Sequence, residues 1–151
     1  MHRSLLEELK AWKNQPARKP ILLDGARQTG KTYLLQNLFS QEFSHTFRID
    51  FLEQPDLVAA FSGSLTPKDI LNNLELLTNQ SIDPEPTLII FDEVGECERA
   101  VQSLKYFAEQ APEYFVVASG SNIGLLQSFP VGKVEQLSLN PLSFTEFLLA
   151  S

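Results

Sequence analysis

The stretch "LLDGARQTGKTY", from Leu22 to Tyr33, decides the fold. Within it, "GARQTGKT" matches the pattern G-x-x-x-x-G-K-[ST], with Gly25, Gly30, Lys31 and Thr32 at the defining positions. Glycines let such a loop wrap tightly enough for its backbone N–H groups to converge on phosphate. The lysine then reaches the β- and γ-phosphates, and the hydroxyl joins the shell of a Mg²⁺ ion. The stretch therefore predicts a phosphate-binding loop.

The sequence on either side of the loop supports this prediction. A phosphate loop should follow a buried strand and open a helix. "ILLD" precedes it as a short apolar run, and the segment from Lys31 to about Phe43 has helical spacing. Arg27 has two equally open roles, since it could touch phosphate or pin the loop. Nucleotide contacts are expected from Gly25, Ala26, Arg27, Gln28, Thr29, Gly30, Lys31, Thr32 and Tyr33.

A pair of acids follows a second apolar run, "TLIIFDEV". Asp92 and Glu93 come at the end of a strand expected over Thr87–Phe91, and the carboxyl ends of parallel strands open onto the ligand crevice. We expect Asp92 to hold Mg²⁺ through a water molecule, and Glu93 to act as general base on the attacking water. The chain has no N-K-x-D motif and no "LSGGQ" signature. The acidic pair therefore favours a P-loop ATPase with a catalytic glutamate.

Polar residues at the ends of two other expected strands are weaker candidates. The fourth strand runs into "SGSNIG", where Ser121 is predicted to sense the γ-phosphate. Ser119 and Asn122 are alternatives, and a plain turn is equally open. Asp50 ends the second strand, and we expect it to be solvated rather than to lie near Glu93.

Two basic residues could act as arginine-finger equivalents on a neighbouring subunit. For both Arg99 and Lys133 a structural role is the favoured interpretation. The lone Cys97 excludes an internal disulfide and fits a reducing compartment.

Composition narrows the class of protein further. The 151 residues fit one domain, and the net charge of −7 argues against a broad basic face for nucleic acid. No apolar run is long enough to span a membrane, and the N-terminus "MHRSLLEELK" lacks the features of a signal peptide. We therefore expect a cytoplasmic protein without membrane or nucleic-acid contact in this segment.

The apolar period alternates between strand-like and helix-like along the chain. It predicts an α/β fold, a three-layer αβα sandwich with a mostly parallel sheet of about five strands and helices on both faces. In the helix expected over 67–78, Thr66 is the predicted N-cap and Ile70, Leu71, Leu74 and Leu77 face inward. Helices are expected over 4–14, 31–43, 55–61, 67–78 and 99–111, and strands over 21–24, 45–51, 87–91, 114–119 and 134–139.

The last residues of the sequence predict the first turns of a further helix. Ser143 and Glu146 form a capping box that begins a helix too short to be stable alone. We therefore expect residues 1–151 to be a single P-loop domain, with its N-terminal helix packed on it, from a longer architecture.

Three stretches, "GARQTGKTYLL", "FDEVGECERAVQSLKYFAEQAPEY" and "FPVGKVEQLSLNPLSFTEFLLA", resemble the N-terminal module of a widespread group of prokaryotic AAA-like ATPases. Members typically carry an uncharacterised C-terminal domain, which is absent here. The resemblance covers nearly the whole chain and implies ATP binding at Gly25–Thr32, Mg²⁺ and water handling at Asp92 and Glu93, and strand order 5-1-4-3-2. Three positions depart from the family pattern, where a glutamine, a proline and a basic residue are common: Gly95, Glu98 and Asp24.

Two functions from different classes follow. The leading one is Mg²⁺-ATP binding with slow hydrolysis, in which Lys31, Glu93 and Ser121 act on the γ-phosphate. Hydrolysis should be slow without an arginine supplied in trans, by a second copy of the chain or by a partner protein. The alternative is a nucleotide-binding or interaction module that does not hydrolyse ATP, and a small-molecule phosphotransferase is a weaker third possibility.

Overall fold

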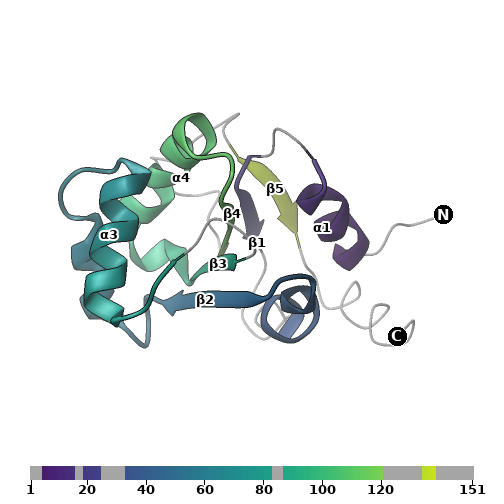
Figure 1. Cartoon of the computed structure of the whole chain (residues 1–151), viewed down its shortest axis with the longest axis horizontal. Coiled ribbons are helices and arrows are strands. Elements are labelled where there is room, and N and C mark those ends of the chain that lie inside the picture. Colours follow the sequence, from purple (N-terminus) through teal and green to yellow (C-terminus); the bar gives the residue numbers. More distant parts are fainter. Residues whose placement is uncertain (1–4, 16–18, 25–32, 83–86, 121–133, 139–151) are drawn as a thin grey trace.

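Five strands form the central sheet of the computed structural model, which describes residues 5–15, 19–24, 33–82, 87–120 and 134–138 (Figure 1). Their spatial order is β2-β3-β4-β1-β5, and all neighbouring pairs are parallel. The predicted order 5-1-4-3-2 is therefore confirmed. The strands are β1 Ile21–Asp24, β2 His45–Asp50, β3 Thr87–Asp92, β4 Phe115–Gly120 and β5 Glu135–Ser138.

Helices cover both faces of this sheet. Parallel strands need crossover connections, and these carry the helices. In Figure 1, α3 and α4 lie on one side of the sheet and α1 on the other. β3 and β4 are buried along their whole length, as continuous apolar runs such as "TLIIF" indicate. The expected three-layer sandwich is confirmed, with α1 Leu5–Lys13, α3 Pro67–Thr78 and α4 Glu98–Gln110.

The segment after the phosphate loop differs from the single α-helix predicted over 31–43. Its described part is a π-helix, η1 Leu34–Leu38, followed by a 3-10 helix, η2 Phe39–Glu42. The backbone N–H of Phe39 bonds to the carbonyls of both Leu34 and Leu35. This wider turn accompanies the complete burial of Phe39 against Phe43, whose ring centroid is 5.2 Å away. The bond from the Phe39 N–H to the Leu34 carbonyl spans five residues, which is the spacing of a π-helix.

The strands sort their buried side chains into two clusters, because successive residues point to opposite faces. On β3, Ile89 and Phe91 pack with residues of α3 and α4. Leu88 and Ile90 instead pack with Leu34 and other residues of η1, η2 and α1. We call this second side the η1 face. Alternation places Asp92, the last residue of β3, on the η1 face as well.

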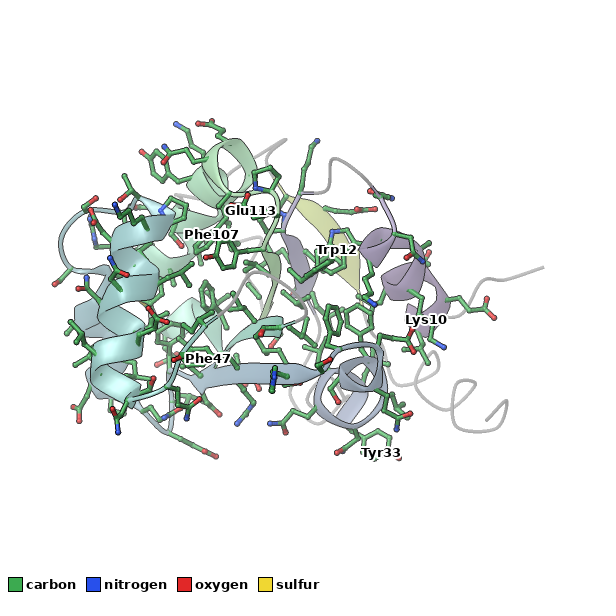
Figure 2. All side chains as sticks on the ribbon, viewed as in Figure 1. Lys10, Trp12, Tyr33, Phe47, Phe107 and Glu113 are labelled. Atoms are coloured by element: carbon green, nitrogen blue, oxygen red, sulfur yellow. The ribbon has the colours of Figure 1, made fainter. Side chains whose placement is uncertain are left out.

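One tryptophan fastens α1 to the η1 face. Trp12 is buried and points from α1 toward the sheet (Figure 2). Its ring centroid lies 6.1 Å from those of both Phe39 and Phe115, and its Nε1 donates a hydrogen bond to the carbonyl oxygen of Lys19 at 2.6 Å. Leu9, one turn earlier, is buried beside it. The helix is therefore an integral part of this core.

One detail predicted for α3 is wrong, the inward placement of Leu77, whereas its bounds and its N-cap residue, Thr66, are as expected. Thr66 stands at the N-cap but makes no capping bond to the backbone; its hydroxyl donates instead to the carboxylate of Asp69 at 2.9 Å. That contact and one from Ser64 hold the pKa of Asp69 below its usual value. Leu77 is 51% exposed rather than inward, because it lies in the last turn, just before the chain leaves the helix at left-handed Asn79.

The remaining predicted elements are shifted slightly or have a different helix type. Residues 55–61 form a 3-10 helix, η3 Pro55–Phe61. α4 begins and ends one residue earlier than predicted, and β4 does so one residue later. β3 extends to include Asp92, which therefore belongs to the strand instead of following it.

Candidate functional site

Four polar side chains meet at the carboxyl ends of three adjacent strands. Arg48 and Asp50 lie on β2, Asp92 ends β3, and Ser119 lies near the end of β4. Asp50 and Asp92 are register partners, and alternation places all four residues on the η1 face. Asp50, Asp92 and Ser119 are buried, with exposed fractions of 7%, 3% and 0%. A buried polar group is costly unless it is hydrogen-bonded, so these contacts define the site.

Asp92 is held from both neighbouring strands. From β2, Arg48 donates two hydrogen bonds to Asp92 Oδ2, from Nε at 2.9 Å and from Nη2 at 2.7 Å. From β4, the Ser119 hydroxyl donates to Asp92 Oδ1. Because different strands contact the two carboxylate oxygens, the carboxylate plane has a fixed orientation.

Asp50 is a structural carboxylate, and the expectation that it would be a solvated strand end is wrong. Its Oδ1 accepts hydrogen bonds from the backbone N–H groups of Leu52 at 2.8 Å and Glu53 at 3.4 Å. Its Oδ2 accepts one from Arg48 Nη2 at 3.1 Å. The Gln54 side chain and backbone close the turn by bonding to the Asp50 N–H and carbonyl. Asp50 is buried because these donors replace water.

Glu93, the predicted general base, occupies an uncommon backbone conformation. It follows β3 directly with φ 55° and ψ 48°, and its side chain is half-buried. A left-handed conformation is rare for a residue other than glycine, and such conformations cluster at functional sites. The chain then turns through η4 Val94–Glu96. Glu93 is thereby taken out of the alternation of β3, immediately beside Asp92.

Most residues of the predicted phosphate site lie outside the described residues. These are Gly25–Thr32 together with Ser121, Asn122 and Lys133. The described flanks are Asp24, which ends β1, and Tyr33, which is 44% exposed. β4 separates β1 from β3, so the end of β1, which precedes the predicted loop, lies two strand spacings, about 10 Å, from β3.

Asp92 has the chemistry expected of a magnesium ligand. Mg²⁺ takes oxygen ligands and is usually bound through one or two carboxylates, several waters and substrate phosphates. Asp92, a buried carboxylate of fixed orientation at the carboxyl end of β3, fits this pattern. Thr32, the other predicted ligand, belongs to the loop outside the described residues.

Two further candidates have structural roles. Arg99 donates from Nε to the Phe61 carbonyl at 2.5 Å and from Nη2 to the Gly63 carbonyl at 2.6 Å. It thus ties α4 to the end of η3, in line with the structural role favoured from the sequence. Cys97 is buried, and this burial raises the pKa of its thiol above the ordinary value of 9.0.

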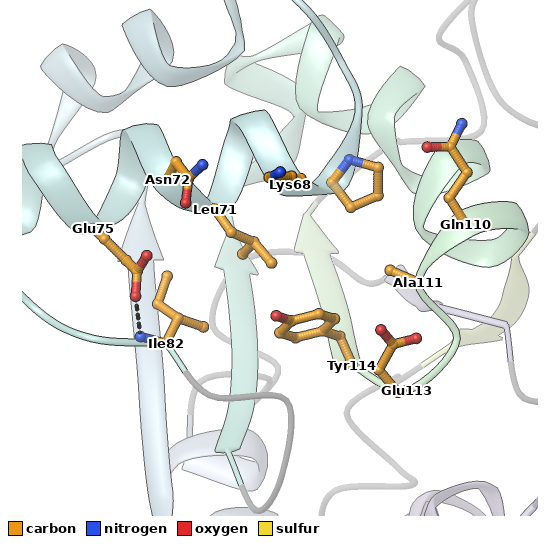
Figure 3. Close-up of a pocket in the computed structure, with 10 residues that line it drawn as sticks. Lys68, Leu71, Asn72, Glu75, Ile82, Gln110, Ala111, Glu113 and Tyr114 are labelled. Carbon is orange, nitrogen blue, oxygen red and sulfur yellow. Dashed lines mark hydrogen bonds between the residues drawn. The ribbon is translucent and has the colours of Figure 1, made fainter.

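A pocket of about 260 Å³ lies elsewhere, between α3 and the C-terminal end of α4 (Figure 3). Lys68, Leu71 and Glu75 of α3 face Tyr114 across it, and Glu75 accepts a hydrogen bond from the Ile82 N–H at 2.8 Å. None of the predicted site residues lines this pocket. It is therefore separate from the site at the strand ends.

Arg48 and the contact between Ser119 and Asp92 were not predicted from the sequence. One signal was present. In "HTFRIDF", Arg48 interrupts an apolar strand two residues before Asp50, a spacing that puts both side chains on one face. Which residue of β3 they would meet depends on strand register, and no local pattern gives that.

Comparison with solved structures supports the fold. PCH-2 of C. elegans superposes with a TM-score of 0.56 at 20% identity, over 90% of this chain and 41% of that one. The Walker-type ATPase PABY2304 of Pyrococcus abyssi gives 0.55 at 17% identity, over 95% of this chain and 56% of that one. The chain thus spans about half the length of these proteins.

The sequence itself matches a family model. No curated protein matches the chain. Among the residues that the structure describes, no helix is long and apolar enough to cross a membrane. The model that matches is described as an AAA domain and covers residues 17–148. Together with the parallel sheet and its strand order, this match shows that the chain belongs to the AAA domain family of nucleotide-binding P-loop modules.

Proposed function

We propose that this chain binds Mg²⁺-ATP and hydrolyses it slowly. The observation that carries the proposal is the fixed Asp92 carboxylate at the end of β3, followed directly by Glu93 in a left-handed conformation. The family supports the ligand, because AAA domains generally bind ATP with Mg²⁺.

Binding of the nucleotide rests on the loop Gly25–Thr32 and on Tyr33 beside it. The backbone N–H groups of the loop hold the phosphate oxygens, and Lys31 neutralises charge between the β- and γ-phosphates. Thr32 and Asp92 would hold the Mg²⁺ ion, which supplies charge neutralisation of the phosphates when bound. Arg48 and Ser119 fix the orientation of the Asp92 carboxylate.

Hydrolysis rests on Glu93. Its carboxylate accepts a proton from the attacking water, which then displaces ADP from the γ-phosphate. Ser121 contacts the γ-phosphate and helps to orient that water. Because the hydroxyl of Ser119 donates to Asp92, we assign the sensing role to Ser121, with Asn122 as the alternative. An arginine from a second copy or a partner protein would accelerate the step, since such a group contributes about 10³–10⁵-fold.

Glu93→Gln tests the catalytic role. The amide cannot accept the proton, so phosphate release should fall by about 10²-fold or more while the Kd for Mg²⁺-ATP stays within about twofold. Glu96→Gln is the matched control, because Glu96 is an exposed glutamate three residues later. Release by Glu93→Gln at the rate of Glu96→Gln would refute the assigned role.

One observation favours the alternative, a module that binds nucleotide without turning it over. Both oxygens of Asp92 already accept hydrogen bonds from the protein, which reduces their availability to a metal ion. Under this alternative, the unmodified chain binds ATP and releases no phosphate above the level of Glu93→Gln. A cytoplasmic location stays a prediction from the sequence.

A further inference from the structure

Arg48 lies between two buried carboxylates. Its Nη2 atom is 3.1 Å from Asp50 Oδ2 and 2.7 Å from Asp92 Oδ2. The two aspartates are register partners on adjacent strands, and their side chains are 10% and 4% exposed. Two carboxylates so close together repel each other unless a cation lies between them. In this structure the cation is the Arg48 guanidinium.

We infer that Arg48 is a built-in counter-ion of Asp92 that competes with the divalent cation and so sets a low metal affinity for this site. The inference rests on the proposed function, because Asp92 is the proposed metal ligand. It assigns a role to a residue of β2 that belongs neither to the phosphate loop nor to the acidic pair.

Arg48 has a different energetic role in the site with and without a metal ion. Without metal, Arg48 is the positive charge that pairs with both Asp50 and Asp92 among the residues that the structure describes, and removing one partner of a buried ion pair is strongly destabilising. With metal bound, the cation compensates Asp92 as well, so the loss of Arg48 costs less. Replacing Arg48 therefore costs more free energy in the metal-free protein than in the metal-bound protein. By this difference, the metal binds more tightly when Arg48 is replaced. Such coupling is reciprocal, so a bound cation in turn weakens the contact between Arg48 and Asp92.

The geometry makes Arg48 an effective competitor. Two of its nitrogens donate to the same oxygen of Asp92, a contact for which the planar guanidinium is pre-organised. Asp50 also holds Arg48 in place, and Asp50 is itself fixed by the turn at Leu52 and Glu53. Arg48 is thus held in place by Asp50 of the same strand, in a position from which it contacts Asp92.

The test uses Mn²⁺ alone as the probe. Binding to the full chain is followed by the loss of the free Mn²⁺ signal in electron paramagnetic resonance. Arg48→Met should bind Mn²⁺ about tenfold more tightly than the unmodified chain, within the usual range of coupling between sites. Arg48→Lys keeps the charge but loses the two-nitrogen contact with Asp92, so its Mn²⁺ affinity should lie between those of Arg48→Met and the unmodified chain.

Two further variants separate the role of the charge from damage to the fold. Lys105→Met removes one exposed positive charge on α4, changing the net charge equally, and should leave Mn²⁺ affinity unchanged. Asp50→Asn removes one of the two carboxylates that Arg48 contacts, so the Arg48 charge then compensates Asp92 alone. This variant should bind Mn²⁺ more weakly, which is the opposite of the effect expected for Arg48→Met. Circular dichroism shows whether each variant is folded. If Arg48→Met does not fold, the Mn²⁺ affinities of Arg48→Lys and Asp50→Asn still test the inference.

The outcomes distinguish this inference from the proposed function. Equal or weaker Mn²⁺ binding by folded Arg48→Met, or tighter binding by Asp50→Asn, would overturn the role of Arg48. ATP binding, measured in the same samples, tests the proposed function separately. A chain that binds no ATP but gains Mn²⁺ affinity on Arg48→Met would refute the proposed function and support the counter-ion.

Discussion

At the scale of single residues, the acidic pair could be identified from sequence but its surroundings could not. Asp92 and Glu93 follow an apolar run, and that pattern alone led to both. The contacts of Arg48 and Ser119 with Asp92 join residues 44 and 27 positions apart. They depend on the register of three strands, which local periodicity does not determine. The burial of Asp50 was missed for the same reason, since it depends on Arg48.

Ser119→Ala should destabilise the protein. The substitution removes the hydroxyl that donates to the buried Asp92 carboxylate, and a hydrogen bond to a charged group contributes about 1.5–3 kcal/mol. Urea unfolding followed by circular dichroism measures the effect. Ser103→Ala is the matched control, because Ser103 is equally buried but bonds only to the Ala100 carbonyl within α4. A loss no larger than that of the control would contradict the importance of the Asp92 contact.

At the scale of elements, type and position were predictable and helix geometry was less so. α3 and the strands follow apolar periodicity with clear boundaries, and their observed bounds lie within about two residues of the predicted ones. The π- and 3-10 geometry of η1 and η2 was not predictable, because it accompanies the packing of Phe39 against Trp12 and Phe43. Leu77 was wrongly predicted to face inward. Periodicity identifies the apolar face of α3, but it does not show whether the core extends as far as the last turn of that helix.

Trp12→Ala should loosen α1 from the sheet. Trp12 fills the space between Phe39 and Phe115 and donates to Lys19, so its truncation leaves a cavity and should cost about 3–5 kcal/mol of unfolding free energy. Chemical unfolding followed by circular dichroism measures this cost. Leu76→Ala on α3, where the side chain is 82% exposed, should change it by less than about 0.5 kcal/mol. Similar losses for both variants would show that α1 contributes no more than surface residues do.

At the scale of the whole molecule, the order of the strands connects the fold to the site. β4 lies between β1, which precedes the predicted phosphate loop, and β3, which ends in Asp92, so the proposed nucleotide site extends across three adjacent strands. The sandwich followed from alternating periodicity, whereas the strand order came only from the family resemblance. Local signals do not specify which strands pair, because pairing is set by crossover connections and by burial of the whole sheet.

The most direct test of the central claim is a calorimetric titration of the chain with Mg²⁺-ATP, beside Lys31→Ala. The account predicts saturable binding of one nucleotide by the unmodified chain and at least about a tenfold loss of affinity in the variant, because the lysine is expected to contact the β- and γ-phosphates. Retained circular dichroism would show that the variant is folded. No binding by the unmodified chain, or equal binding by both proteins, would contradict the claim that Gly25–Thr32 and Asp92 form a nucleotide site.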